Sequence, residues 1–224
     1  MRSAKQLFSN TDKDQIAAAV RRAEEKTFAE IVPVVATASG RYDRAEDLVG
    51  LLTGLLLLAV GWLGCPMFHA IGPWGEGGSG TGLVMAVFTV IVGFVAGAAL
   101  ASRVTFLRLF FLSRREMNEE VRRAAQSVFM SSRIRRTKGG TGVLLYVSLF
   151  ERQVVVLPDD VINEKLPELD WNGACGTIVD GMKRGRPTEA LVQAIEGCGD
   201  LLAVDFPRAS DDVDELANEL VILD

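Results

Sequence analysis

Two long uncharged stretches dominate the pattern of apolar and polar positions along this chain of 224 residues. No charged residue occurs from Leu48 to Phe68 or from Leu83 to Ser102. Each stretch has about the ~20 residues that a helix needs to cross ~30 Å of hydrocarbon. The pattern predicts a two-helix transmembrane hairpin over residues 48–102, with a loop outside the cell at residues 69–82.

The charges beside the two stretches predict an orientation. The loop holds no Lys or Arg, whereas Arg41 and Arg44 precede the first stretch and Arg103 and Arg108 follow the second. Cytoplasmic segments carry an excess of Lys and Arg, so we expect both termini in the cytoplasm. The chain begins with polar residues and no apolar signal core. We therefore predict a multi-pass protein of the cell (inner) membrane, with the lipid bilayer as a partner.

The segments outside the hairpin show the periodicities of a soluble α/β domain. Thr11 and Asp14 match a capping box at the start of an amphipathic helix, and an apolar strand, Ile31–Ala36, follows it. A further amphipathic helix is predicted around residues 117–128. Continuous apolar runs at 142–149 and 154–157 predict two adjacent strands buried on both faces. The strand before the hairpin needs these as partners, so residues 1–46 and 103–207 are expected to form one split domain.

Two more helices and an acidic tail complete the prediction. One helix is expected to open near Pro167 and the other at Pro187, because proline suits the first turn of a helix. Cys175 and Cys198 lie on their apolar stripes and are expected to be packed thiols. The tail, residues 208–224, is predicted either as an acidic helix or as disordered, two alternatives that the sequence leaves open.

Composition changes this picture mainly through the distribution of charge. The net charge is −5, yet residues 103–138 hold ten Lys and Arg against three acidic residues. Within this segment, contact with anionic lipid headgroups is expected at four residues, namely Arg133, Arg135, Arg136 and Lys138. A basic residue at a membrane surface is worth about 1 kcal/mol. The alternative is a solvated basic face. Stacking aromatics are not interleaved, so we expect no nucleic-acid partner.

The chain offers few residues for metal or acid–base chemistry. Three cysteines without a C-x-x-C pair and a single histidine, His69, argue against zinc and multi-histidine sites. Asp159 and Asp160 follow an apolar strand and could hold Ca²⁺ or Mg²⁺ through oxygen ligands. The alternative is that they cap the short helix DVINEKL by accepting backbone N–H bonds. No cofactor is required by either interpretation.

Four segments of the sequence together resemble the TPM-domain family, which includes thylakoid proteins linked to photosystem repair and many bacterial membrane proteins of unknown role. They are TDKDQIAAAVRRAEEKTF, AEIVPVVA, TGVLLYVSLFERQVVVLPDDVI and GRPTEALVQAIEGCGDLLAVDFP. The resemblance implies an α/β fold in which helices sandwich a small mixed sheet. The transmembrane hairpin lies outside the resemblance and is expected as an insertion in this fold. For some members it also implies calcium binding or a weak acid phosphatase activity.

The sequence supports two hypotheses about function. In the first, the cytoplasmic TPM-like domain is a non-catalytic binding or quality-control module that holds another membrane or membrane-associated protein near the bilayer. Its basis is the basic segment near the membrane and the acidic tail. The alternative is a weak metal-dependent acid phosphatase, in which Asp159 and Asp160 hold a divalent cation that polarises a phosphoryl oxygen. The sequence leaves open whether the protein is an enzyme.

Overall fold

The computed structural model describes residues 3–40, 42–64, 81–104, 113–132, 134, 140–166, 171–208 and 216–224. The chain divides into two units. One unit combines Met1–Gly40 with Arg115–Asp224, and the other is Arg41–Arg114. Segments on both sides of the apolar stretches therefore fold together.

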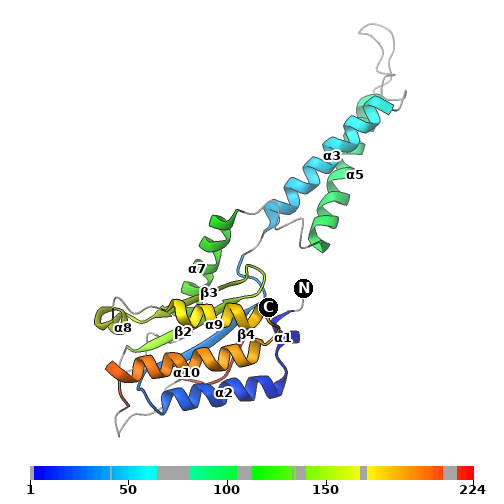
Figure 1. Ribbon diagram of the computed structural model, residues 1–224. Helices are drawn as coiled ribbons and strands as arrows, with labels where there is room; N and C mark the ends of the chain where they lie inside the picture. The colour runs from blue at the N-terminus through cyan, green and yellow to red at the C-terminus, as the bar shows by residue number, and fades with distance from the viewer. Residues whose placement is uncertain are drawn as a thin grey trace. The chain divides into compact units, whose positions relative to one another are not determined.

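A four-stranded mixed sheet forms the centre of the first unit (Figure 1). Its strands are β1 (Glu30–Ala36), β2 (Gly142–Ser148), β3 (Gln153–Pro158) and β4 (Val221–Leu223), in the order β3-β2-β1-β4. The central strand β1 is parallel to both β2 and β4, whereas β2 and β3 are antiparallel. The predicted strand before the hairpin thus has its partners after the hairpin, as expected.

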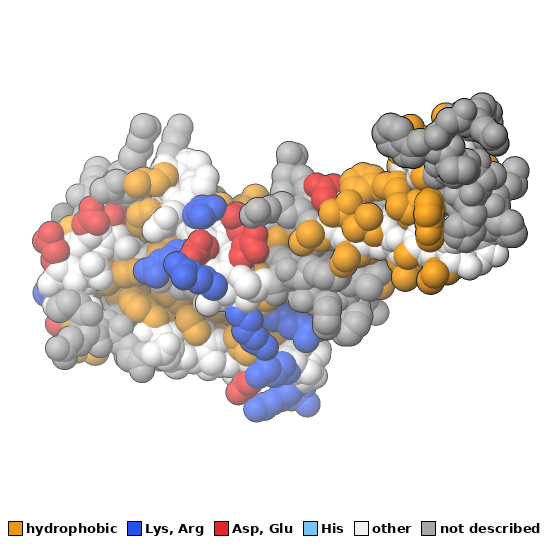
Figure 2. All heavy atoms as spheres, turned by 90° about the horizontal axis from the view of Figure 1, so that it is seen from above, with side chains coloured by type: hydrophobic (Ala, Val, Ile, Leu, Met, Phe, Trp, Pro, Cys, Tyr) orange, Lys and Arg blue, Asp and Glu red, His pale blue; other side chains and the backbone are white. Residues whose placement is uncertain are grey.

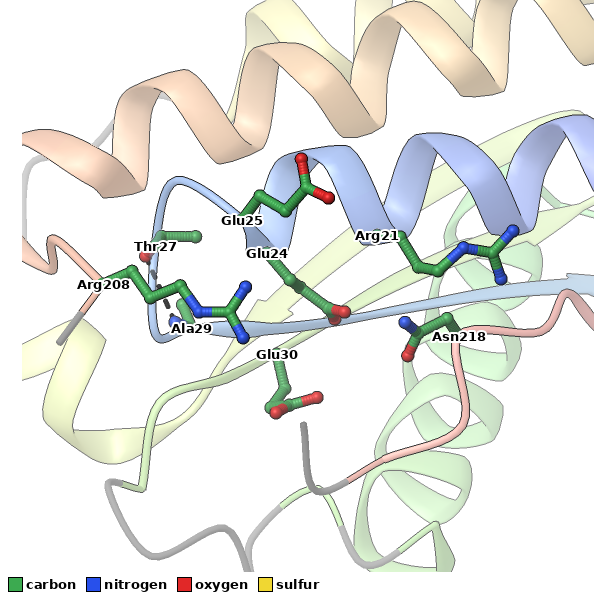
Figure 3. A pocket seen from close by; sticks show the side chains of 8 residues that line it. All are labelled: Arg21, Glu24, Glu25, Thr27, Ala29, Glu30, Arg208 and Asn218. Atoms are coloured by element: carbon green, nitrogen blue, oxygen red, sulfur yellow. Dashed lines mark hydrogen bonds between the residues drawn. The ribbon is translucent and has the colours of Figure 1, made fainter. Parts of the chain in front are cut away.

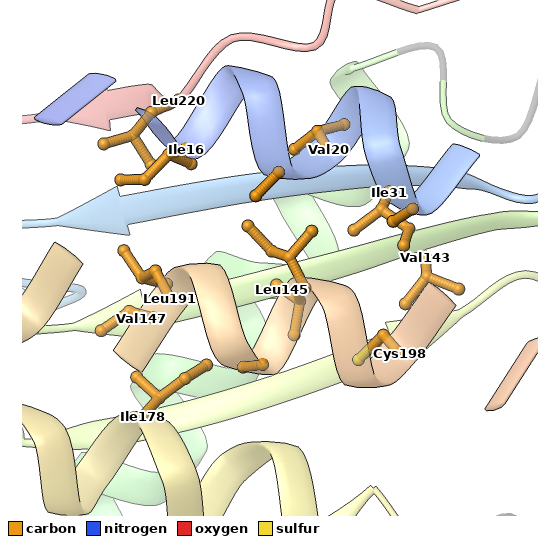
Figure 4. Packing of buried hydrophobic residues seen from close by; sticks show 14 of the residues in the cluster. Ile16, Val20, Ile31, Val143, Leu145, Val147, Ile178, Leu191, Cys198 and Leu220 are labelled. Atoms are coloured by element: carbon orange, nitrogen blue, oxygen red, sulfur yellow. The ribbon is translucent and has the colours of Figure 1, made fainter. Parts of the chain in front are cut away.

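Every residue of β1 and β2 is buried, because helices cover both faces of the sheet. One face packs against α2 (Asn10–Glu24), α9 (Asn172–Lys183) and α10 (Pro187–Asp205). Figure 4 shows this cluster, with Ile16 and Val20 of α2 along β1 and Leu191 of α10 beside Val147 of β2. The opposite face packs against α7 (Arg114–Ser131). The predicted α/β fold, with helices on both faces of a small mixed sheet, is confirmed.

Two short helices complete this unit, α1 (Ala4–Leu7) and α8 (Asp160–Lys165). The capping box predicted at Thr11 and Asp14 is wrong by two residues. Ser9 is the N-cap of α2, where its Oγ accepts from the N–H of Asp12 at 3.2 Å and its own N–H donates to the Asp12 carboxylate at 2.8 Å. Phe8, the residue before this N-cap, is only 2% exposed. Its burial in the core fixes the chain just before α2, which explains why the helix begins earlier than predicted.

The end of the chain joins the sheet instead of forming a helix. Val221–Leu223 pairs with Val34–Ala36 as strand β4, and Leu220 is 7% exposed in the core. The helical alternative for the tail is therefore wrong for the described residues 216–224, and so is disorder there. A parallel edge strand of three residues gives too short an apolar run to stand out within an acidic segment.

The second unit contains two long apolar helices, α3 (Asp43–Gly64) and α5 (Thr81–Arg103), which pack side by side (Figure 1). Within them, Glu46–Gly64 and Gly82–Arg103 are long and apolar enough to cross a membrane. Only 17% and 11% of their most apolar windows are buried. Figure 2 shows hydrophobic side chains over the surface of these helices, so they are not the core helices of a soluble fold.

Glycines set the contact between α3 and α5. A Cβ at Gly93 would lie 2.7 Å from Cα of Gly54, and a Cβ at Gly97 would lie 3.0 Å from Cα of Gly50. Residues later in α5 thus contact residues earlier in α3, which makes the two helices an antiparallel hairpin. Gly50/Gly54 and Gly93/Gly97 are both G-x-x-x-G pairs, a spacing that lets helix backbones approach closely in membranes.

Candidate functional site

A polar pocket lies at the amino end of β1, between the end of α2 and the C-terminal part of the chain (Figure 3). Its volume is about 160 Å³. The lining residues come from three segments: Arg21, Glu24, Glu25, Thr27, Ala29, Glu30, Arg208 and Asn218. Five of these eight residues are charged, which makes the cavity a candidate binding site.

Two buried carboxylates define the chemistry of this pocket. Glu24 is 8% exposed and Glu30 is 6% exposed, and both side chains point into the pocket. The Glu24 carboxylate accepts the N–H of Ile31 at 3.0 Å, which fixes it beside the start of β1. Buried charges are tolerated in proteins when they are paired and hydrogen-bonded. Arg208 lines the same pocket (Figure 3), so the pocket mixes both signs of charge.

The residues that connect α2 to β1 hold the C-terminal part of the chain against this pocket. The hydroxyl of Thr27 donates to the carbonyl of Phe206 at 2.6 Å and accepts the N–H of Ala29 at 3.1 Å. The N–H of Arg208 donates to the carbonyl of Lys26 at 3.2 Å. These hydrogen bonds fix the backbone of Arg208 beside the pocket.

The sequence analysis did not identify Glu24 or Glu30 as site residues. A signal was present, because Glu24 is four residues after Val20 and eight after Ile16, both fully buried. Positions at this spacing share one face of a helix, so a carboxylate was placed on the apolar face of α2. A charge at such a position is rare unless it is paired or functional.

A second polar cluster lies at the carboxyl end of β1 and β2. The hydroxyl of Ser39 donates to Ser148 Oγ at 2.8 Å and shares a hydrogen bond with the Tyr146 hydroxyl at 3.0 Å. Ser148 in turn donates to the carboxylate of Glu151. That carboxylate also accepts the N–H groups of Ser39 at 2.9 Å and Gly40 at 3.3 Å. Burial raises the pKa of Tyr146, so its phenol stays neutral within this network.

This second cluster fastens the point at which the chain leaves the first unit. Gly40 is the last residue of that segment of the unit, and α3 begins at Asp43. Glu151 is 7% exposed, and its carboxylate accepts hydrogen bonds from the backbone N–H groups of residues 39 and 40. The geometry assigns it a structural task, although the carboxyl ends of parallel strands are a common place for ligand sites in α/β folds.

The two aspartates predicted from the sequence have different environments. Asp159 is 4% exposed and is the N-cap of α8, where its carboxylate accepts the N–H of Asp160 at 2.8 Å. Asp160 is exposed in the first turn of the same helix. The capping alternative therefore describes Asp159 well.

This aspartate pair is a poor donor set for a hard cation. Ca²⁺ takes six to eight oxygen ligands, and no group of three or more His, Cys, Asp or Glu side chains in the described residues could hold a metal. The two carboxylates alone do not meet this requirement. Cation binding at Asp159 and Asp160 stays a prediction, and no reaction step is derived from it.

The four basic residues predicted to contact lipid, Arg133, Arg135, Arg136 and Lys138, lie outside the described residues. Of the predicted packed thiols, Cys198 is fully buried and Cys175 is half-buried. Burial raises the pKa of Cys198 to about 12. This thiol is therefore inert at neutral pH, as expected for a core residue.

Comparison with known proteins supports the family resemblance over part of the chain. Residues 102–201 match the family model of the TPM domain. This segment includes α7, β2, β3, α8, α9 and most of α10, so the match falls on the second part of the split unit.

Among solved structures, the chain is similar to the NMR structure of the BA42 protein from the psychrophilic bacterium Bizionia argentinensis. The TM-score is 0.57 at 20% sequence identity, and 99% of each chain is covered. At this identity the likeness concerns the fold alone. No curated protein sequence matches the chain.

Proposed function

We propose that this protein is an integral membrane protein whose TPM domain acts as a non-catalytic binding module at the cytoplasmic surface. The observation that carries the proposal is the pair of apolar helices α3 and α5, inserted between two parts of one folded unit. The proposal has two parts, membrane anchoring and partner binding, and they rest on different observations.

Anchoring is supported by what the outer surface of the hairpin presents. Large side chains such as Leu56, Leu63 and Phe88 are 64%, 84% and 66% exposed. Soluble monomers rarely expose contiguous apolar patches of more than a few hundred Å². A bilayer removes this apolar area from water at no cost to the fold, so a membrane is the environment that suits these helices best.

Anchoring is also supported by the polar side chains within the helices. The hydroxyl of Thr53 donates to the carbonyl of Val49 at 2.7 Å, and that of Thr89 donates to the carbonyl of Met85 at 2.8 Å. Ser102 donates to the carbonyl of Ala99 at 2.9 Å. Each hydroxyl is thus satisfied by its own helix, as hydrocarbon surroundings demand because water is absent there.

The experiment for anchoring measures insertion and orientation separately. Full-length protein is expected to stay in the membrane fraction after alkaline carbonate extraction. With the native cysteines replaced, a Ser79→Cys variant is expected to react with a membrane-impermeant maleimide from outside the cell, because the charge bias predicts cytoplasmic termini. Release by carbonate would overturn anchoring, whereas labelling only from the cytoplasmic side would overturn the orientation.

Partner binding is the less direct part of the proposal. The non-catalytic part of the proposal is supported by two acidic residues that have structural roles. Asp159 caps α8, and Glu151 binds the backbone of residues 39 and 40. The pocket around Glu24 and Glu30 adds a built polar cavity on the same unit. We propose another membrane or membrane-associated protein as the partner, recognised in part by the acidic residues of the tail.

A charge-neutralised variant tests the role of the acidic tail without changing the residues of β4. Changing Asp211, Asp212, Asp214 and Glu215 to their amides keeps residues 216–224, which contain strand β4. Proteins captured from detergent extract by the full-length chain are expected to be lost with this variant. Identical captured sets would argue against recognition through the acidic tail.

A metal-dependent phosphatase is the second candidate, favoured by the TPM-domain match and by the exposed carboxylate of Asp160 beside Asp159. In this hypothesis a divalent cation supplies charge stabilisation to a phosphoryl group. The purified protein would then release phosphate from a generic ester only when metal is present. Loss of that release in Asp160→Asn, at an unchanged melting temperature, would displace the binding-module proposal.

A further inference from the structure

We propose that the outward face of α7 binds the phosphate groups of anionic lipids, an inference that rests on the proposed membrane anchoring. The face, here called the arginine stripe, consists of Arg115, Glu119, Arg122, Arg123, Gln126 and Met130. These positions recur at intervals of three or four residues, so they follow one side of the helix. An adjoining side of α7 carries the buried residues Val121, Ala125 and Phe129.

The stripe is available for contact along most of its length. The side chains of Arg115 and Arg123 are 89% and 66% exposed, and Met130 is 64% exposed. By contrast, Val121 and Ala125 are fully buried against the sheet. The helix is thus amphipathic, with its apolar side satisfied by the sheet and its basic side turned away from it.

Two carboxylates, Glu119 and Glu120, form ion pairs with the arginines of the stripe. The Nε of Arg115 donates to Oε1 of Glu119 at 3.0 Å, and Nη2 of Arg123 lies 3.6 Å from Oε2 of the same carboxylate. Within the described part of the chain, Arg122 makes no ion pair. Nη1 of Arg123 also donates to Oε1 of Glu120, beside the stripe, at 2.8 Å. The three guanidinium groups therefore share two carboxylates, which leaves one excess positive charge and the N–H donors of Arg122.

The ligand is identified by the chemistry of these donors. A guanidinium is planar and presents its N–H groups as a fork that fits two oxygens of a phosphate. The exposed thioether of Met130 adds an apolar group at the end of the stripe, suited to the boundary between headgroups and acyl chains. A row of arginines beside an exposed apolar side chain matches an anionic membrane surface in both respects.

The chain itself keeps α7 near such a surface. Helix α5 ends at Arg103 and α7 begins at Arg114, so residues 104–113 are all that separate them. A segment of this length spans roughly 35 Å at full extension. If α5 ends at the cytoplasmic headgroups, the first turn of α7 is held within that distance of anionic lipid.

The test uses full-length protein reconstituted into vesicles of phosphatidylcholine, with or without phosphatidylglycerol. Cys65 and Cys175 are changed to Ser and the buried Cys198 to Ala, and a fluorophore is attached at Gln126→Cys. Nitroxide-headgroup lipids quench the fluorophore when the stripe lies among the headgroups. Quenching is expected to be greater in the anionic vesicles and to lose this increase at about 1 M salt, where the screening length is about 3 Å.

Two triple variants show whether the increase depends on the stripe. Arg115→Gln, Arg122→Gln and Arg123→Gln together are expected to reduce quenching to the level of neutral vesicles. The matched control changes Lys183, Arg184 and Arg186 to Gln, which removes the same charge from exposed positions around the turn between α9 and α10. The control is expected to keep the full increase, and circular dichroism checks that both variants remain folded.

The possible failures are distinguishable. Protein that floats with both kinds of vesicle but shows equal quenching in them overturns the stripe proposal and leaves membrane anchoring intact. Protein that floats with neither overturns anchoring and this inference together. An increase that the control also loses reflects general charge attraction and overturns the stripe. If the stripe variant loses a captured protein but not quenching, the ligand is an acidic protein surface instead of lipid.

Discussion

At the scale of single residues, the first unit uses its buried acidic groups at the two ends of one strand. Glu24 and Glu30 lie at the amino end of β1, and Glu151 lies at its carboxyl end. Each is less than a tenth exposed. Since an ionised carboxylate is costly to bury without partners, these positions constrain the surrounding backbone and side chains far more than a surface acid does.

Asp159 offers a direct test of capping against cation binding. Asp159→Ala removes the N-cap of α8, so it is expected to lower the free energy of unfolding by about 1 kcal/mol. Asp160→Ala removes an exposed side chain and is expected to change it by less than about 0.5 kcal/mol. Chemical denaturation in detergent measures both values.

The calcium dependence of the same variants supplies the other half of the test. If the pair holds a cation, added Ca²⁺ raises the melting temperature of the unchanged protein and both variants lose that rise. If Asp159 acts only as a cap, Ca²⁺ leaves all three melting temperatures unchanged. Equal destabilisation by the two substitutions would contradict the capping role.

At the scale of elements, the apolar periodicity predicted the helices and strands that bury large side chains. It placed β1, β2 and β3 nearly where they are, because continuous apolar runs identify strands. The prediction of burial on both faces holds for β2 and is wrong for β3, an edge strand whose residues are all only partly buried. It failed for β4, whose three residues follow an acidic segment and pair with a strand almost two hundred positions earlier. Such a pairing leaves no local pattern to detect.

The site was less predictable than the fold for a related reason. Glu24, Glu30 and Arg208 are brought together by three separate segments, and each alone looks like an ordinary surface charge. Only Glu24 carried a local signal, its position on the buried face of α2. The cluster of Ser39, Tyr146 and Ser148 likewise depends on the register of β1 and β2, which places Ala36 beside Ser148.

The hairpin contact gives a prediction at the scale of elements. Gly93→Ala places a Cβ 2.7 Å from Cα of Gly54, where only backbone movement can relieve the clash. We expect this change to destabilise the pairing of α3 and α5 by about 1–3 kcal/mol, the usual range for overpacking. Unfolding of the helices by titration with denaturing detergent measures it.

Gly64→Ala is the matched control for the hairpin. A Cβ at Gly64, the last residue of α3, meets no atom within 4 Å. Both variants make the same chemical change in a helix, so a difference between them isolates the clash. Equal stability of the two variants would show that the helices do not pack through their glycines.

At the scale of the whole molecule, the apolar hairpin interrupts the sequence of a unit whose sheet is complete only with the last residues of the chain. β4 covers the edge of β1, and Leu220 enters the core beside it. A chain that stops at Pro207 therefore loses part of its sheet as well as its acidic tail. Changes in partner binding after that truncation would report misfolding, which is why the amide substitutions are the better test.

The contacts of Asp224 make the closure of the sheet sensitive to acid. The hydroxyl of Thr37 donates to one Asp224 carboxylate oxygen at 2.6 Å, and Lys5 Nζ lies 3.2 Å from the other. The hydrogen bond from Thr37, assisted by Lys5, lowers the pKa of Asp224 below its usual 3.8. A group whose pKa is lower in the folded state stabilises that state above its unfolded pKa and loses this contribution as pH falls through the folded value.

We therefore expect Asp224→Asn to destabilise the protein at about pH 6 and to have a smaller effect at about pH 2, because the charged carboxylate is less populated there. The midpoint of urea unfolding, measured for the variant and the unchanged chain at both pH values, gives the difference. Asp14→Asn, which removes an exposed carboxylate from α2, is the control for a general change in net charge. A destabilisation by Asp224→Asn that is the same at both pH values would mean that Asp224 acts through packing at the end of β4, and not through its charge.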